Sequence, residues 1–174
     1  MNRLEDWDVR LSAWLALPRV DRRWPLAARI AHLGDAGPIF LAMTMIYLVG
    51  WLAGYGSLRL AMVIQLMVLL ATALVIFIIK YTLRRERPSD PGSFVAIQYD
   101  KFSFPSGHSA RVSCLAVSML YFNLFLGLAL LLVAFMVGAA RVIVGVHYVG
   151  DVVVGLALGA ITAMAVVNLF NLFL

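Results

Sequence analysis

Charged side chains are scarce in this chain of 174 residues: they make up 13% of it, whereas hydrophobic side chains make up 63%. Soluble domains carry roughly 25% charged and 45–50% apolar residues, so the composition excludes a soluble globular protein. The run from Leu60 to Ile79 contains no charge and has about the 20 residues that a helix needs to cross a bilayer. We therefore expect an integral membrane protein with several spans.

Cysteine and acidic residues are scarce as well. The only cysteine, Cys114, lies in an apolar run and cannot form an intrachain disulfide, so the sequence does not define a redox compartment. Fourteen Lys and Arg against nine Asp and Glu give a formal charge of +5, an excess that membrane proteins usually keep beside their spans, and no nucleic-acid partner is expected. Glu5 and Asp6 stand where a signal peptide needs basic and then apolar residues, so no cleaved signal is expected.

Residues 1–36 form the most polar part of the chain and predict an amphipathic interfacial segment. Apolar residues recur there at helical spacing with charges between them, at Leu4, Trp7, Leu11, Trp14 and Leu15. Pro18 and Pro25 interrupt the pattern. The tryptophans at positions 7, 14 and 24 are typical of the aromatic belt at headgroup level, so we expect this segment to lie in the membrane interface rather than to cross the membrane.

The remaining residues, 37–174, are expected to form one transmembrane domain, an all-α helical bundle. Its apolar runs cover about residues 39–53, 58–79, 112–140 and 152–174. The third run has 29 residues, which is long for one span and short for two. If it forms a helical hairpin, Asn123 and Gly127 are the candidate turn positions. Small residues at Gly155, Gly159 and Ala160 predict close packing of the last span.

Polar residues beside spans are costly to keep there, which makes them the place to look for chemistry. Three clusters qualify. The first runs from Lys80 to Arg87-Pro88, the second is Pro105-Ser106-Gly107-His108, and the third consists of Arg141, His147 and Asp151.

The second cluster has two interpretations. Ser106 and Gly107 stand just before an apolar run, so their backbone N–H groups can form an anion site at a helix N-terminus. Pro105 fixes the entry to the turn, and Gly107 lets the backbone approach a ligand without an intervening Cβ. An ordinary loop-to-helix junction explains the same residues equally well.

The third cluster supplies a histidine, a carboxylate and a cation. His147 and Asp151 are four residues apart, which places them on one face if the segment is helical. A carboxylate on one ring nitrogen fixes the tautomer and leaves the other nitrogen as a nucleophile or base, whereas the structural alternative is a polar pair that caps the last span. Arg141, Lys80 and Arg87 can each hold phosphate oxygens, although each taken alone is typical of a snorkelling residue at the membrane edge.

In their order and spacing, the three clusters resemble the three signature motifs of the type 2 phosphatidic acid phosphatase superfamily, also called lipid phosphate phosphatases. The resemblance covers about residues 80–151. It implies that His147 is a nucleophile that forms a phosphohistidine, that Asp151 orients it, and that His108 is the general acid and base. The residues implied to hold the phosphate are Lys80, Arg87, Ser106, the Gly107 amide and Arg141.

One position departs from this family pattern. The third motif usually has Ser before its Arg, and this chain has Ala140 there. We expect a phosphate hold that is weaker by about one hydrogen bond, with the nucleophile unaffected.

The resemblance implies a metal-independent lipid phosphatase without a cofactor, because three fixed cations take the electrostatic role that Mg²⁺ has elsewhere. Its partners would be membrane lipids and a lipid phosphate, such as phosphatidate, phosphatidylglycerophosphate, a polyprenyl (di)phosphate or a lipid A phosphate. Two other hypotheses are a non-catalytic protein that binds lipid phosphate, and a metal-dependent membrane hydrolase with His108, His147 and Asp151 as ligands. The sequence indicates no oligomeric state.

Three polar residues are interpreted as having no role in the site. His32 is expected at the interface near a turn. Arg84 and Arg85 occupy free positions of the first motif and are expected to be solvated, where they can attract anionic head groups.

If His108 and His147 act on one phosphate, they must lie on the same side of the bilayer, so residues 112–140 must form a hairpin of two spans. The chain then has about five spans, with its N-terminus and all three motifs on one side. Three of the 14 Lys and Arg belong to the site, and ten of the other eleven lie on that side, with Arg59 opposite. The positive-inside rule therefore predicts a site that faces the cytoplasm of the cell (inner) membrane. Bacterial members of the family usually have six spans and face the site away from the cytoplasm, so the resemblance implies the opposite orientation.

Overall fold

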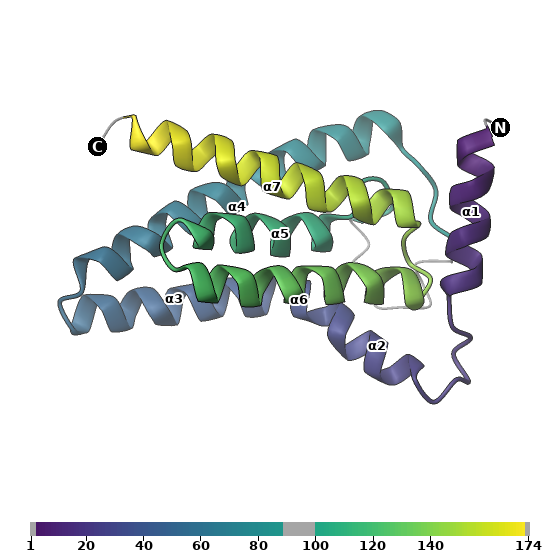
Figure 1. Cartoon of the computed structure of the whole chain (residues 1–174), viewed down its shortest axis with the longest axis horizontal. Helices are drawn as coiled ribbons and strands as arrows, with labels where there is room; N and C mark the ends of the chain where they lie inside the picture. Colours follow the sequence, from purple (N-terminus) through teal and green to yellow (C-terminus); the bar gives the residue numbers. More distant parts are fainter. Residues whose placement is uncertain (1–2, 89–99, 173–174) are drawn as a thin grey trace.

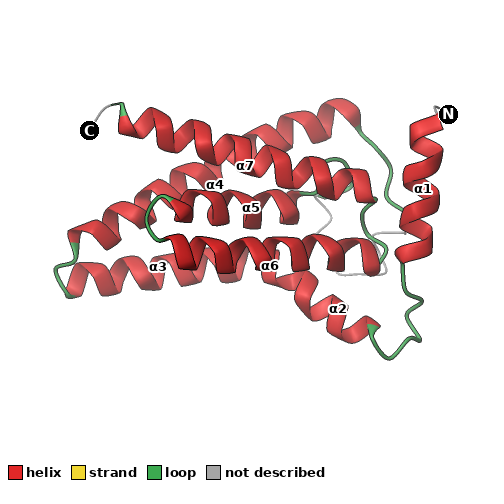
Figure 2. Cartoon of the chain, in the orientation of Figure 1, coloured by secondary structure: helices red, strands yellow, loops and turns green. Residues whose placement is uncertain are grey.

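The computed structural model describes residues 3–88 and 100–172 of the chain, with side chains from residue 5 onward. Every regular element in these ranges is a helix (Figure 2), which confirms the all-α prediction. In chain order the elements are α1 (Arg3–Leu15), α2 (Trp24–Ala31), the 3₁₀ helix η1 (His32–Gly34), α3 (Ala36–Leu52), α4 (Gly56–Leu83), α5 (Gly107–Leu120), α6 (Leu124–Ile143) and α7 (Val149–Asn171).

Helices α3 to α7 run lengthwise through the molecule as a bundle (Figure 1). Helix α5 is the central element, because it packs against α4, α6 and α7, while α3 packs along α4. The outer faces carry large apolar side chains that are exposed, among them Phe40, Phe77 and Phe135. Such a continuous apolar exterior is typical of a surface that contacts lipid.

The run of 29 apolar residues is a helical hairpin. Helix α5 ends at Leu120 and α6 begins at Leu124, so the turn lies at residues 121–123. Asn123 caps α6, since its Oδ1 accepts a 2.9 Å hydrogen bond from the backbone N–H of Leu126. This confirms the hairpin and its turn at Asn123. The other candidate, Gly127, instead lies where the helices touch, because a Cβ added there would be 2.5 Å from Cδ2 of Leu120.

Among the described residues, three helices are long and apolar enough to cross a membrane: α4, α6 and α7. Helices α2 and α3 pass the same test together as a pair bent by 48°. Helix α5, with 14 residues, is only about 21 Å long, which is shorter than the hydrocarbon core of about 30 Å. The structure therefore supports three or four spans by length and composition, and the predicted five stay a prediction.

The N-terminal segment is helical and is interrupted at Pro18 as predicted, whereas Pro25 begins a second helix instead of breaking one. Helix α1 ends at Leu15, before Pro18, and α2 begins at Trp24 with Pro25 in its first turn. Helix α1 lies across one end of the bundle rather than along it (Figure 1). Trp7 and Trp14 on this helix are 71% and 80% exposed, as expected of side chains that insert into a membrane interface.

Two glycines allow α7 to pack directly on the backbone of α5 and of the segment before it. A Cβ added to Gly155 would be 2.5 Å from the carbonyl oxygen of Ser106, and one added to Gly159 would be 2.2 Å from that of Ala110. The close packing predicted at these positions is confirmed. It brings the N-terminal end of α7 against the N-terminal end of α5, where two of the polar motifs lie.

The three motifs meet at one end of the bundle. Helix α4 ends there, α5 begins there, and the connection from α6 to α7 lies at the same end (Figure 1). Backbone contacts join the segments, since the N–H of Ser106 donates to the carbonyl of Asp151 over 2.9 Å and Nη1 of Arg87 donates to the carbonyl of Val146 over 3.1 Å. The prediction that His108 and His147 lie at the same end is confirmed.

Candidate active site

His147 lies at the centre of this end and is fully buried. Its Nδ1 is 3.4 Å from Oδ2 of Asp151, wider than a good hydrogen bond but close enough for electrostatic pairing. Neither ring nitrogen has a hydrogen-bond partner among the described residues. Buried polar atoms are rarely left without partners, so the ring is placed to receive a ligand.

Asp151 and His147 lie together, but not because they share a helical face. Helix α7 begins at Val149, so His147 precedes it. Oδ2 of Asp151 accepts a 2.9 Å hydrogen bond from the backbone N–H of Tyr148 and so caps the helix. The interpretation that the two residues share one helical face is therefore wrong. The alternative, that Asp151 caps the last helix, is correct, and the capping carboxylate still lies beside His147.

Three buried cations surround the histidine. Lys80 is 6% exposed, Arg141 is 5% exposed, and the side chain of Arg87 is 3% exposed. Lys80 comes from the last turns of α4, Arg87 from the loop that follows, and Arg141 from the last turn of α6. Burying three cations together is unfavourable unless an anion is present, so the cluster is suited to hold a phosphate group.

The anion in contact with two of these cations is Asp100. Its Oδ2 lies 2.8 Å from Nη2 of Arg87, and its Oδ1 accepts a hydrogen bond from Nζ of Lys80. Burial alone would raise the pKa of the Asp100 carboxyl, but the charges of Lys80 and Arg87 outweigh burial and hold the pKa at about 2. The carboxylate is therefore charged at any physiological pH.

The same surroundings keep His147 neutral. Burial and the charges of Arg141, Arg87 and Lys80 lower the pKa of its ring well below the usual value, although Asp100 opposes them. A neutral imidazole has a free electron pair on one nitrogen, which is the form that a nucleophile or base requires.

The second motif begins α5. Ser106 is the N-cap residue, and its hydroxyl pairs with that of Ser109 at 2.9 Å. Its backbone N–H donates to the Asp151 carbonyl, so the prediction that this N–H serves an anion is wrong. Gly107 is the first residue of the helix, where backbone N–H groups point outward. A Cβ added there would meet Ile76 at an ordinary 3.8 Å, so packing does not demand the glycine.

His108, one residue further on, is paired with a carboxylate that the sequence did not indicate. Its Nε2 lies 2.7 Å from Oδ1 of Asp35, the residue just before α3. Nδ1 of His32 lies 2.9 Å from Oδ2 of the same carboxylate. His32 is thus near a turn, as expected, but contacts the motif residue through Asp35.

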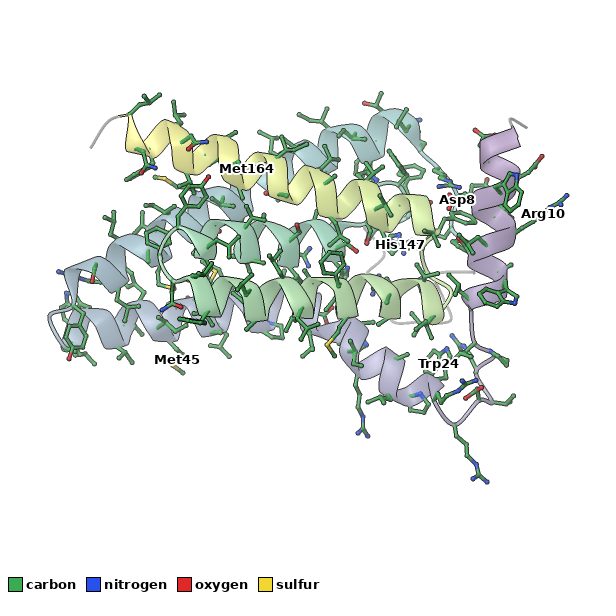
Figure 3. The ribbon with its side chains drawn as sticks, viewed as in Figure 1. Asp8, Arg10, Trp24, Met45, His147 and Met164 are labelled. Atoms are coloured by element: carbon green, nitrogen blue, oxygen red, sulfur yellow. The ribbon has the colours of Figure 1, made fainter. Side chains whose placement is uncertain are left out.

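Arg85 is not solvated, contrary to the prediction, whereas Arg84 is exposed as predicted. Nη1 of Arg85 donates to Oδ1 of Asp151 over 2.7 Å, and Nη2 donates to Oδ2 of Asp8 over 2.8 Å. Asp8 also accepts a 2.8 Å hydrogen bond from the N–H of Gly150. Figure 3 shows Asp8 on α1 at the end of the bundle where His147 lies, so this helix is joined to the site by charged side chains.

A groove of about 460 Å³ borders His147 and Tyr148. One wall comes from α1 and the segment after it, and the other from the residues between α6 and α7. Its apolar lining includes Val9, Ala13, Leu17, Pro18 and Val144. Among the described residues, no three His, Cys, Asp or Glu side chains come together as a metal site would require.

Comparison with known sequences identifies relatives of the part of the chain that carries the three motifs. A model of the PAP2 superfamily matches residues 61–173. Decaprenylphosphoryl-5-phosphoribose phosphatase from Mycobacterium tuberculosis is 38% identical over 95 residues, which are 52% of this chain and 50% of that protein. The match therefore spans about half the length of this relative.

Two crystal structures have a similar fold. One is the PAP2 type phosphatidylglycerolphosphate phosphatase from Bacillus subtilis, with a TM-score of 0.81 and 24% identity over 98% of this chain and 88% of that one. The other is LpxE from Aquifex aeolicus, with a TM-score of 0.71 and 20% identity over 92% of this chain and 94% of that one. At these identities the comparison concerns the fold alone.

Proposed function

The chain belongs to the PAP2 superfamily, and from this premise we propose that it is a metal-independent phosphoric ester hydrolase that removes phosphate from a membrane lipid. The observation that carries the proposal is a buried, neutral His147 beside Asp151, among three buried cations from three different segments. This arrangement supplies a nucleophile and a preformed positive site for the oxygens of a phosphate.

In the first step, His147 attacks phosphorus. Because Nδ1 faces Asp151, Nε2 forms the N–P bond, and the P–O bond to the lipid breaks with its electron pair on the oxygen. His108 gives a proton to that oxygen, so the lipid leaves as an alcohol or a shorter phosphate. Lys80, Arg87 and Arg141 stabilise the charge on the other phosphate oxygens, together with the hydroxyl of Ser106 and the Gly107 amide.

In the second step, His108 takes a proton from water, and the hydroxide attacks the phosphohistidine. The N–P bond breaks, phosphate leaves, and both histidines return to their starting states. The protons therefore balance over one cycle, and neither step requires an electron acceptor or donor. Ala140 offers no hydroxyl, so the hold on phosphate lacks that donor.

The substrate is proposed to be a lipid because the site lies where apolar helices end. The apolar groove next to His147 can accept the part of a lipid that adjoins its phosphate. Exposed Trp7 and Trp14 on α1 suit the interface where such head groups lie. Candidate substrates are phosphatidate, phosphatidylglycerophosphate, a polyprenyl (di)phosphate and a lipid A phosphate, to which decaprenylphosphoryl-5-phosphoribose is added from the name of the relative.

The proposed topology has five spans, α3 to α7, with residues 1–36 in the interface of the cell membrane and residues 37–174 as the transmembrane domain. Helix α5 is shorter than a bilayer core, but it packs against α4, α6 and α7 and none of its residues is exposed, so protein rather than lipid surrounds it. An odd number of spans places the N-terminus and the motifs on one side.

Phosphate release from this panel by the protein in detergent tests the function. We expect turnover of at least one lipid phosphate that persists in EDTA. His147→Ala should abolish turnover, whereas His108→Ala should lose most rate on poor leaving groups, because only His108 protonates the departing oxygen. Ser57→Ala, an exposed residue at the opposite end, is the matched control.

Three outcomes contradict the proposal in different ways. Inactivity of the wild-type protein on every lipid phosphate, with binding retained, favours a non-catalytic lipid-phosphate-binding protein. Loss of activity in EDTA that returns with a divalent metal favours a metal-dependent hydrolase. Wild-type activity of His147→Ala overturns the nucleophile assignment, as does failure to trap acid-labile ³²P on the protein.

A further inference from the structure

The carboxylate of Asp35 joins two histidines instead of capping a helix. Asp35 is the N-cap residue of α3, where an Asp side chain normally accepts a hydrogen bond from the first turn, yet its side chain makes no such bond. Its Oδ1 lies 2.7 Å from Nε2 of His108, and its Oδ2 lies 2.9 Å from Nδ1 of His32. Both oxygens are thus oriented by ring nitrogens.

The segment that carries Asp35 is fixed against α5. Nη1 of Arg111, one turn after His108, donates to the carbonyl of Gly34. A Cβ added to Gly34 would be 3.1 Å from Cβ of His108 and 3.2 Å from Cγ1 of Val137, which is tighter than ordinary contact. The approach of Asp35 to His108 is therefore set by close backbone packing and not by a freely moving side chain.

The surroundings of His108 disfavour its protonated form, which the Asp35 carboxylate can stabilise. Burial is the largest effect that opposes a positive charge on the ring, and Arg141 and Arg111 oppose it as well, whereas Asp35 favours one. The hydrogen bond with His108 is the largest of the effects that hold the pKa of Asp35 at about 2, with His32 contributing, against a smaller opposing effect of burial. Asp35 is thus an anion at any pH at which the protein would work.

We propose that Asp35 is a positioning residue for the general acid, which holds Nε2–H of His108, stabilises the protonated ring and leaves Nδ1 to exchange the proton. The assignment rests on the proposed function. Nδ1 of His108 is buried and has no hydrogen-bond partner among the described residues, as expected of an atom that faces a substrate. In the first step the proton passes from Nδ1 to the departing oxygen as the P–O bond breaks. In the second step Nδ1 takes a proton from water while the oxygen of that water bonds to phosphorus. Asp35 stays ionised in both steps.

The chain thus contains two histidine–carboxylate pairs with different functions. Asp151 lies beside His147, which must be neutral to attack, and Arg85 binds the same carboxylate and offsets its charge. Asp35 has no arginine in an ion pair with it among the described contacts; its partners are His108 and the half-exposed His32. An anion without a cationic side chain on it stabilises a protonated histidine more strongly.

Asp35→Asn tests the assignment, because it keeps the size of the side chain and removes its charge. The variant is compared with wild type on an alkyl lipid phosphate, whose leaving group needs a proton, and on an aryl phosphate such as p-nitrophenyl phosphate, whose leaving group does not. We expect kcat to fall by about tenfold to a hundredfold on the lipid and by less than about threefold on the aryl ester. The alkaline limb of the pH–rate profile on the lipid should move to lower pH. Asp21→Asn, in an exposed ion pair with Arg23, is the matched control.

Equal loss on both substrates, or no loss on either, overturns the assignment. A further constraint comes from the double variant: in a His108→Ala background, Asp35→Asn should have little additional effect, and additive losses overturn the assignment as well.

A readout without substrate separates this proposal from the proposed function. In protein labelled with ¹³C at histidine, the His108 signal is identified by its loss in His108→Asn, and its titration is followed by NMR. Asp35→Asn should move that titration to lower pH by about one unit. An unmoved titration overturns the pairing even if the enzyme is active. Absence of phosphatase activity in the wild type contradicts the proposed function and leaves this measurement valid.

Discussion

Nη1 of Arg85 donates a 2.7 Å hydrogen bond to Oδ1 of Asp151, so the loop after α4 holds the carboxylate that faces His147. The other nitrogen of the same guanidinium binds Asp8 of α1. We predict that Arg85→Gln lowers kcat by about tenfold to a hundredfold, because it leaves the buried Asp151 carboxylate without its cation and releases α1 from the site. Phosphate release from a lipid substrate in detergent measures this loss.

The neighbouring arginine is the control for this prediction. Arg84 is exposed and hydrogen-bonds only locally, through Nε to the carbonyl of Tyr81, among the contacts described. Arg84→Gln should keep kcat within about twofold of wild type. Equal effects of the two substitutions would mean that both arginines act through the general positive charge of the loop and not through Asp151.

Asp100 forms ion pairs with two of the cations that would bind the phosphate of the proposed substrate. Its carboxylate contacts Lys80 and Arg87, which would hold the phosphate oxygens. We predict that Asp100→Asn lowers KM for a lipid phosphate several-fold, because phosphate then meets cations that no longer pair with a protein carboxylate. Since the pKa of Asp100 is about 2, the group is ionised at every working pH, and the effect should be the same from pH 5 to 8. Initial rates against substrate concentration across this range measure it.

Glu86→Gln removes a negative charge from the same loop at an exposed position and serves as the control. Its KM should change by less than about twofold. A KM that rises in Asp100→Asn would show instead that Asp100 holds the cations in place for the substrate.

Much of the architecture was predictable from the sequence because the signals are local. Apolar runs define helices, and Gly155 and Gly159 mark close packing. The hairpin is not a local signal, because Asn123 and Gly127 are only candidate turns; it follows from the requirement that His108 and His147 act on one phosphate. Once the hairpin is assigned, helix parity brings the motifs to one end. The clustering of Lys80, Arg87, Arg141 and His147 therefore follows from motif positions at helix ends.

The carboxylates around the site could not be predicted in the same way. Asp8 and Asp35 lie among residues 1–36, far along the chain from Arg85 and His108, which they contact. Their contacts form only when α1 and η1 pack against the end of the bundle, and the residue spacing within a single motif does not predict that packing. Arg85 was misjudged for a related reason: its side chain faces inward because Arg84 ends α4 in the left-handed conformation, at φ 50°, which redirects the following residue.

Gly159 tests whether the contact of α7 with α5 holds the bundle together. A Cβ at this position would lie 2.2 Å from the carbonyl oxygen of Ala110, so the two backbones must separate. We predict that Gly159→Ala destabilises the protein by about 1–3 kcal/mol and lowers the thermal unfolding midpoint in detergent by roughly 3–10 °C. Gly37→Ala is the control, since no described atom lies within 4 Å of its added Cβ and Ala favours the helix. An equal midpoint for both variants would contradict close packing of α5 and α7.

The side of the membrane that the site faces follows from the charge distribution if the five-span topology holds. Ten of the eleven Lys and Arg outside the site lie with the motifs, and Arg59 lies at the opposite end, in the first turn of α4. The positive-inside rule then predicts a cytoplasmic site, against the usual orientation of bacterial members of the family. In a Cys114→Ser background, single cysteines replace Glu86 at the site end or Ser57 at the opposite end, both exposed positions. A membrane-impermeant thiol reagent should label Ser57→Cys in intact cells and Glu86→Cys only after permeabilisation. The reverse pattern would show that the site faces outward and that the arginines of the interfacial segment, which lie at the membrane surface, do not determine orientation as loop arginines do.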